Sequence, residues 1–377
     1  MSVFEQLQQA FDSSGLAAVL KKAETELRGE RRYHELFEVL KMKSRQAIGL
    51  PLLHDAEQKL SDEQQRKLED ELLASCRDVG FSLLSEGQVQ DSWVYLRHLQ
   101  DHQPVLDAVK KIDVNEENLD QVLGLLLYEG LDCEAGYALV LQHYGTCNAI
   151  TTMQQALYNR SKPDRQAAGR LLVKHVHQEL LENVKGHVQR QEETEPTAAR
   201  LHELIKDRDF LFADGSYHID TSHLSSTIQV AGELTDEASI QLALDMAEYG
   251  KHLDEGLQYP GDPPFEDLYP SYAKFFAAQL GKDVDEAIAF FGDRARATDA
   301  HQEGTFAIET YVDLLSRVSK TEEAIQASVE LIPEGIQTTG RAPTLYDLSE
   351  QLGDFSRYRD LCVTRNDLLG YVISLEK

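Results

Sequence analysis

The sequence predicts an all-α protein of stacked antiparallel helix pairs, an α-solenoid, with an irregular insertion in its central part. Apolar residues recur three and four positions apart along most of the 377 residues, which is the spacing of one face of an α-helix. Leu, Ala, Glu, Asp and Gln dominate, a composition that favours helices overall. Helix–turn–helix patterns also return at spacings between 33 and 43 residues, as in helical-repeat proteins.

An antiparallel helix pair opens the predicted N-terminal repeat region, residues 1–142. Apolar residues follow the helical spacing over 16–27 and again over 33–48, and Arg28-Gly29-Glu30 supplies a tight turn between them. A third helix is expected to begin at Ser61 and run towards Leu84, because Ser-Asp-Glu provides an N-cap and an acidic first turn.

Two further segments of the N-terminal region repeat the same pattern. Residues 83–99 end one helix at Glu86-Gly87 and begin another, and residues 125–141 do the same at Glu129-Gly130, 43 positions later. A single helix pair cannot bury its own apolar face, so neighbouring pairs are expected to stack on one another.

The C-terminal region, residues 271–377, carries the clearest series of helix pairs. First helices are expected at 271–280, 306–318 and 344–352, and the second helices begin near Val284, Thr321 and Asp354. These second starts lie 37 and 33 residues apart, close to the period of about 34 residues that tetratricopeptide repeats have.

The C-terminal pairs therefore resemble tetratricopeptide (TPR) repeats. Ala287, Ala324 and Tyr358 fall where a second helix packs against its partner, and Pro333 follows a second helix. The resemblance implies a TPR-like α-solenoid with a concave face that binds a small-molecule or peptide ligand. It identifies no individual binding residue.

The central region, residues 143–270, keeps the helices and loses the period. A long helix is expected over 163–191 and another over 238–253. The loop 258–270 is rich in proline and aromatic residues, which predicts a rigid, irregular segment. Two interpretations of this loop remain open: a lid or binding edge, and a structured connector between helices.

Charge and composition restrict the classes of partner. The chain has 65 acidic and 37 basic side chains, a formal charge of −28 that disfavours nucleic acid and anionic membrane surfaces. Its densest basic run, Arg28 with Arg31 and Arg32, is interleaved with glutamates. No stretch approaches the roughly 18 apolar residues of a membrane span. No Walker A or dinucleotide-binding pattern predicts a nucleotide cofactor.

The cellular location expected from the sequence is the cytoplasm. The first residues carry no basic segment ahead of an apolar core, so they do not read as a secretory signal. The four cysteines are far apart and form no CxxC pair, which disfavours a zinc ribbon and a disulfide framework and fits reduced thiols.

The stretch 211–224, LFADGSYHIDTSHL, is the strongest candidate for chemistry in the central region. An extended residue followed by a helix start can bring His218, Asp220 and His223 together. With His177, or with the His175 and Glu179 pair one helical turn apart, they would form the ligand set of a divalent metal such as Zn, Mn or Fe. Such a site with an open position supports hydrolysis.

A structural interpretation of the same residues competes with the metal site. Asp220 is a good N-cap for a helix beginning at Thr221, with His223 in its first turn and His218 packed beneath. His177 and His187 both fall on the apolar face of the long helix, about 15 Å apart along its axis, so they cannot bind one ion together. A lone histidine on such a face is usually a core side chain.

Other reactive groups complete the set of candidates. Glu233, Asp245 and Glu248 could supply a carboxylate ligand or a general base, but no pattern distinguishes one of them. Cys147, in Gly-Thr-Cys-Asn, follows His143 by four residues and would be an activated nucleophile if it begins a helix.

Two functions are therefore expected as alternatives. The first is a metal-dependent, hydrolase-type enzyme that acts on a small or peptide-like substrate in the concave face. The second is a non-catalytic TPR-like protein–protein interaction scaffold, in which the histidines are structural.

Overall fold

A computed structural model describes residues 1–53, 60–198 and 200–377. Every regular element within these ranges is a helix, and they contain no strand. The all-α prediction is therefore confirmed for the described residues. The chain divides into two compact units, Met1–Val140 and Leu141–Lys377. The predicted regions 143–270 and 271–377 both lie within the second unit.

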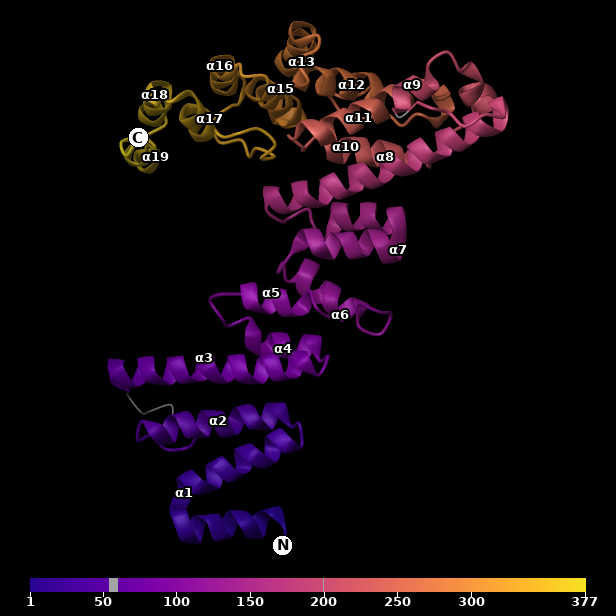
Figure 1. Ribbon diagram of the computed structural model, residues 1–377. Helices are drawn as coiled ribbons and strands as arrows, with labels where there is room; N and C mark the ends of the chain where they lie inside the picture. The colour runs from indigo at the N-terminus through magenta and orange to yellow at the C-terminus, as the bar shows by residue number, and fades with distance from the viewer. Residues whose placement is uncertain (54–59, 199) are drawn as a thin grey trace. The chain divides into compact units, whose positions relative to one another are not determined.

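The first unit consists of helices that follow one another along the chain (Figure 1). Helix α1 packs against α2, α2 against α3 and α3 against α4. The elements are α1 (Val3–Gly29), α2 (Tyr33–Ala47), α3 (Asp62–Ser85), α4 (Val89–Leu96), α5 (Gln103–Val109), α6 (Leu119–Leu123), a π-helical turn (Gly124–Tyr128) and the first part of α7 (Cys133–Gln155). Helix α1 bends at Gly15, so the helix predicted over 16–27 is its segment after the bend.

Glycine turns separate the repeated segments of the first unit as predicted. Gly87 lies between α3 and α4 with φ +76°, and Gly130 precedes α7 with φ +81°. A side chain disfavours this left-handed conformation, so glycine is suited to both turns. Leu36, Val79 and Leu83, all fully or almost fully buried, form the core between α2 and α3.

The long helix α8 (Lys162–Glu192) organises the first half of the second unit. Helices α10 (Thr221–Ala231) and α11 (Glu237–Gly250) pack against it, and α9 (Leu201–Ile205) contacts both α8 and α11. The predicted apolar face of α8 is its buried face: Leu172, Val176, Leu180 and Val184 are all 0% exposed. A 3-10 segment over Asp209–Gly215 leads into α10.

The second half of this unit continues as paired helices. Two second helices contact their own first helix and also the first helix of the next pair: α13 touches α12 and α15, and α16 touches α15 and α17. The elements are a 3-10 turn (Glu255–Leu257), α12 (Leu268–Gln279), α13 (Val284–Ala297), α14 (Ala300–Glu303), α15 (Phe306–Arg317), α16 (Thr321–Leu331), α17 (Leu345–Leu352), α18 (Ser356–Thr364) and α19 (Leu368–Ser374).

Three second helices begin close to the predicted positions. Helices α13 and α16 start at Val284 and Thr321 as expected, and α18 starts at Ser356 instead of Asp354. Ala287 and Ala324 are 0% exposed, so small residues occur where these helices pack tightly.

The proline-rich loop ends earlier than predicted, because α12 already begins at Leu268 and Pro270 belongs to the helix. The loop is anchored by Phe265, which is 2% exposed. Its ring stacks on Tyr272, with the centroids 3.8 Å apart. These contacts favour the structured connector over a lid.

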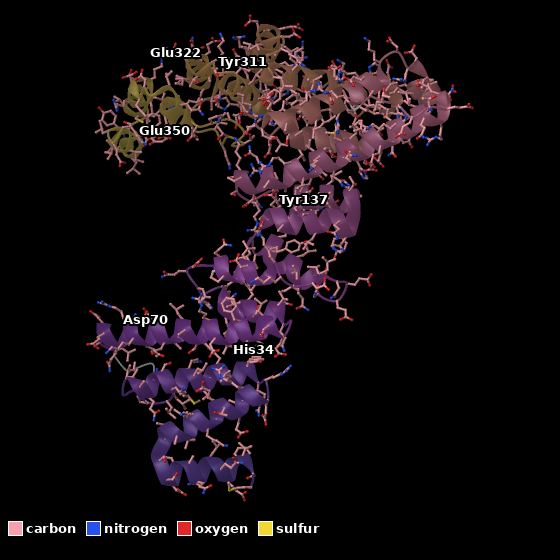
Figure 2. All side chains as sticks on the ribbon, viewed as in Figure 1. His34, Asp70, Tyr137, Tyr311, Glu322 and Glu350 are labelled. Carbon is pink, nitrogen blue, oxygen red and sulfur yellow. The ribbon has the colours of Figure 1, made fainter. Side chains whose placement is uncertain are left out.

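Acidic side chains lie on the exposed faces of several helices. Asp70 on α3 and Glu322 on α16 are exposed and carry no ion pair within the described residues, and Glu350 on α17 pairs with Lys377 at 2.7 Å (Figure 2). Over the ranges that the structure covers, no helix is at once long enough and apolar enough to cross a membrane.

Candidate functional site

His218 is held by hydrogen bonds from two helices. Its ring Nδ1 lies 2.9 Å from the hydroxyl of Tyr249 on α11, and its Nε2 lies 2.8 Å from Nδ1 of His187 on α8. The backbone N–H of His218 also donates to the Tyr249 hydroxyl, at 3.0 Å, and the Asn183 side-chain amide donates to its carbonyl, at 2.8 Å. These contacts fix the ring between α8 and α11.

The protonation state of His218 follows from its surroundings. Burial lowers the pKa of His218 to about 4, and the nearby charges of His187 and Arg190 lower it as well. The neutral ring has one N–H. When the Tyr249 hydroxyl donates to Nδ1, the N–H sits on Nε2 and donates to His187. This assignment satisfies each group in the chain and uses both nitrogens of His218.

The partner of His218 on the long helix differs from the prediction. The structure brings His218 to His187, whereas the sequence predicts that it converges with His177 or His175. Residues 177 and 187 are about 15 Å apart along the helix, so the contact with His187 places His218 beside the later turns of α8.

Asp220 caps α10, as the structural interpretation predicts. Its Oδ1 accepts hydrogen bonds from the backbone N–H groups of Ser222, at 2.9 Å, and His223, at 3.3 Å. The hydrogen bond from the Ser222 hydroxyl is the main cause that lowers the pKa of Asp220. His223 is half-buried in the first turn. The cap accounts for the side chain of Asp220 and for the backbone N–H of His223.

His177 faces a different carboxylate, Asp245 on α11. His177 Nε2 lies 3.6 Å from Asp245 Oδ2, and His202 Nδ1 lies 3.9 Å from the other oxygen. His177 and Asp245 are 7% and 8% exposed. Gln241 donates to Asp245 at 3.1 Å. Among the three carboxylates left open by the sequence, Asp245 is therefore the one that contacts a predicted histidine.

The other two carboxylates pair with cations instead. Glu233 binds Arg165 at 3.0 Å, and Glu248 of α11 binds Lys251, the residue that follows this helix, at 2.6 Å. Both contacts are ordinary ion pairs.

His175 and Glu179 lie on one strip of α8, as their spacing predicts. Both contact the Thr146 hydroxyl on α7, at 3.1 Å from His175 Nε2 and 3.5 Å from Glu179 Oε2. The pair therefore joins α8 to α7 and makes no contact with His218, whose ring nitrogens bind His187 and Tyr249.

The described residues contain no group of three or more His, Cys, Asp or Glu side chains placed to hold a metal ion. The metal site therefore stays a prediction that the geometry does not support. That prediction comprises His177, His218, Asp220 and His223, with His175 and Glu179 as secondary ligands.

Cys147 lies just after a sharp bend of α7 at Gly145, whose φ is +76°. Both Cys147 and His143 are exposed, and no hydrogen bond joins them in the part of the chain that the structure covers. The geometry therefore does not support the nucleophilic pair that the sequence suggests.

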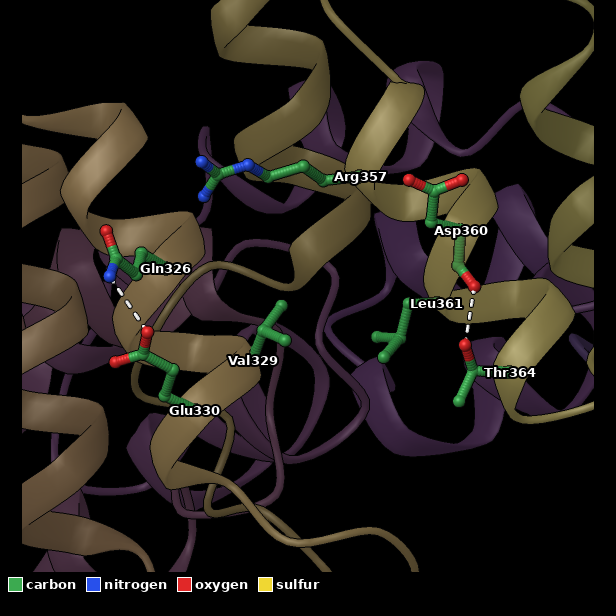
Figure 3. A pocket seen from close by; sticks show the side chains of 7 residues that line it. All are labelled: Gln326, Val329, Glu330, Arg357, Asp360, Leu361 and Thr364. Atoms are coloured by element: carbon green, nitrogen blue, oxygen red, sulfur yellow. Dashed lines mark hydrogen bonds between the residues drawn. The ribbon is translucent and has the colours of Figure 1, made fainter.

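A groove lies between α16 and α18, at residues that no sequence pattern marks as a site. Its volume is about 380 Å³. Figure 3 shows Val329 on α16 and Leu361 on α18 on opposite sides of this hollow. Val329 is 38% exposed and Leu361 is half-buried, so the groove has an accessible apolar floor.

Polar side chains form the rim of the groove. Gln326 donates to Glu330 at 2.8 Å, which orders both side chains along α16 (Figure 3). On α18, the side chains of Arg357 and Asp360 make no hydrogen bond or ion pair within the described ranges. The rim thus offers a cation and a carboxylate that are free to bind a ligand.

The groove extends into a second hollow of about 200 Å³. Val329 and Leu361 line both hollows, and the second one reaches the irregular segment that precedes α17, including Thr338 and Pro343. The helix period could have placed α16 and α18 side by side. It could not show that their facing apolar residues leave an open space.

Comparison of the chain with protein-family models, curated proteins and solved structures finds no match.

Proposed function

We propose that this chain is a non-catalytic, TPR-like interaction scaffold that binds an extended segment of a partner protein in the groove between α16 and α18. One observation carries the proposal: Val329 and Leu361 form an accessible apolar floor between facing helices, with unpaired charged groups at the rim. A groove of this kind suits a peptide that inserts an apolar side chain and bonds to the rim through polar groups.

The shape of the site favours an extended segment over a small molecule. The two hollows adjoin at Val329 and Leu361, so the binding surface continues from the outer turns of α16 and α18 to the segment before α17. The stack of paired helices, in which second helices contact two first helices, supplies the rigid support that such a surface needs.

Charge defines the chemistry of the partner. Two carboxylates on opposite sides of the groove, Glu330 and Asp360, outnumber the one cation, Arg357, among its described lining residues. The whole chain carries a charge of −28. A partner segment with an apolar residue flanked by Lys or Arg would place its cations near these carboxylates. Long-range attraction by the acidic surface would also accelerate the association.

Selection from a random peptide library displayed on phage tests the proposal with the full chain as bait. We expect enrichment of sequences with an apolar residue flanked by basic residues. A selected peptide, labelled with a fluorophore, is then titrated with the protein. The variants Val329→Glu and Leu361→Glu should weaken binding at least tenfold, since each one places a charge in the apolar floor.

Val363→Glu is the matched control, because Val363 is on α18 and 69% exposed outside the groove. It should leave the affinity unchanged. Selection that yields no enriched sequence, or peptides whose binding responds equally to all three variants, would refute binding in this groove.

The metal-dependent enzyme remains the alternative prediction. No specific observation favours it, because the ring nitrogens of His218 are engaged with His187 and Tyr249, and Asp220 caps α10.

A further inference from the structure

A separate cavity, of about 270 Å³, lies in the unit formed by residues 141–377. Four of its lining side chains are cationic: Lys162 and Arg165 from the start of α8, Arg317 from the end of α15, and Arg341 from the segment before α17. Glu233 is the one carboxylate among the lining residues described. Such a concentration of cations is unexpected in a chain with a net charge of −28.

The two arginines at the inner end of the cavity are more than nine-tenths buried. The side chains of Arg317 and Arg341 are 9% and 8% exposed. Within the described residues, the Nε atom of each has no hydrogen-bond partner. Asp313 Oδ2, 3.9 Å from Arg341 Nε, likewise makes no hydrogen bond in the part of the chain that the structure describes, so the charge of Arg341 is balanced at long range and not by a hydrogen-bonded carboxylate.

The positive charge of Arg317 has closer partners than the positive charge of Arg341. Arg317 donates to the Leu234 carbonyl at 2.6 Å and pairs with Asp313 at 2.8 Å. Arg341 has a long contact of 3.9 Å to Asp313 and a hydrogen bond of 3.4 Å to the Gly232 carbonyl. Its guanidinium also lies over the rings of Phe265, Phe275 and Phe306, at 5.1 to 5.7 Å from their centroids. The two guanidinium groups thus share one carboxylate.

Another nearby carboxylate, that of Glu309, accepts hydrogen bonds from the backbone. Glu309, 1% exposed, accepts hydrogen bonds from the N–H groups of Thr339, at 2.7 Å, and Arg341, at 3.0 Å. These bonds place the segment 339–341 against the cavity. Gly340, with φ +78°, permits the turn that directs Arg341 inwards.

The outer cations are available to a ligand. Lys162 Nζ has one hydrogen bond, to the Arg341 carbonyl at 3.4 Å, and is half-exposed. Lys162 is also the first residue of a 31-residue helix, and the backbone N–H groups at a helix N-terminus add positive potential. Arg165 pairs with Glu233 at 3.0 Å, so one cation of the outer pair is already compensated.

We propose that this cavity binds the phosphate group of a small phosphate monoester. The buried guanidinium groups supply N–H donors suited to a phosphate oxygen, and Lys162 supplies a mobile point charge. Half-buried Phe306 and exposed Tyr158 also line the cavity and would pack against the organic part of the ligand. The volume, near the low end of the roughly 300–1,000 Å³ of ligand pockets, fits a small molecule.

Phenyl phosphate is the probe for this site, and its binding to the full chain is measured by isothermal titration calorimetry. We expect saturable binding of one molecule per chain, weaker at higher salt concentration because the interaction is ionic. Phenol and benzoate at the same concentrations should bind at least tenfold more weakly. Saturable binding of phenol with equal affinity, or tighter binding of benzoate, would overturn the assignment to phosphate.

Lys162→Gln tests the location without disturbing the buried arginines. It should weaken phenyl phosphate binding at least tenfold. Lys174→Gln is the matched control, because Lys174 is exposed on the same helix and lies outside the cavity. The control should bind as the wild type does. No binding by the wild type, or equal losses in both variants, would refute the site, since equal losses would mean a response to net charge alone.

Discussion

Nε2 of His218 lies 2.8 Å from Nδ1 of His187, although the two residues are 31 positions apart in the sequence. The contact joins the entry to α10 with the long helix α8, and Tyr249 on α11 binds the other nitrogen of the same ring at 2.9 Å. Together these groups form a hydrogen-bonded chain whose stability depends on the protonation of His218.

Acidification should therefore destabilise the second unit. The ordinary pKa of 6.5 falls to about 4 for His218 in the folded chain. Between these values the unfolded chain binds the proton and the folded chain does not, so stability falls as the pH falls from 6.5 to 4. Once the pH is below both pKa values, this linkage has lowered the free energy of unfolding by about 3 kcal/mol. Urea unfolding followed by circular dichroism over this pH range measures it.

His218→Asn should reduce that pH dependence, although it also costs stability at pH 7 by removing the contact with His187. His301→Gln is the control, since His301 is exposed on α14 and should leave the dependence unchanged. An unchanged pH dependence in His218→Asn would show that other groups cause the destabilisation.

The cap at the start of α10 should have a measurable effect on stability. Asp220→Ala removes the acceptor of two backbone N–H groups and should cost about 1 kcal/mol in urea unfolding at pH 7. Asp220→Asn keeps an acceptor oxygen and should cost much less. Equal losses in the two variants would contradict the capping role.

The hydrogen-bonded state of His218 also gives an expectation for metal content. Metal ligation requires a free lone pair on the imidazole, and both ring nitrogens are engaged here. Protein purified without a metal-affinity tag should contain far less than one Zn, Mn or Fe per chain by elemental analysis. Near-stoichiometric metal that is lost in the His218→Ala, His223→Ala variant, with its helical spectrum retained, would restore the metal hypothesis.

Periodicity predicts the helices well, because the burial of one face is encoded every three to four residues. The helix expected over 163–191 is Lys162–Glu192 in the structure, and its predicted apolar face is buried. The sequence likewise places Ala287 and Ala324 at helix contacts, and both are fully buried.

Contacts between elements far apart in sequence could not be predicted in the same way. The spacing of His177 and His187 shows that both lie on the apolar face of α8. Which of them contacts His218 depends on the turn of α8 against which the residues before α10 pack. Arg341 falls in an irregular segment without a period, so nothing in the sequence indicates that its guanidinium is buried beside Arg317. The groove between α16 and α18 could not be predicted either, because it depends on the distance between two helices.

The location of a bound peptide is the most direct test of the scaffold proposal. Hydrogen–deuterium exchange of the full chain, with and without a peptide selected as described, measures which backbone amides the peptide protects. We predict that protection concentrates on α16 and α18 around Val329 and Leu361, and that Val329→Glu abolishes it. Protection confined to other helices, with α16 and α18 unchanged, would contradict binding in the groove.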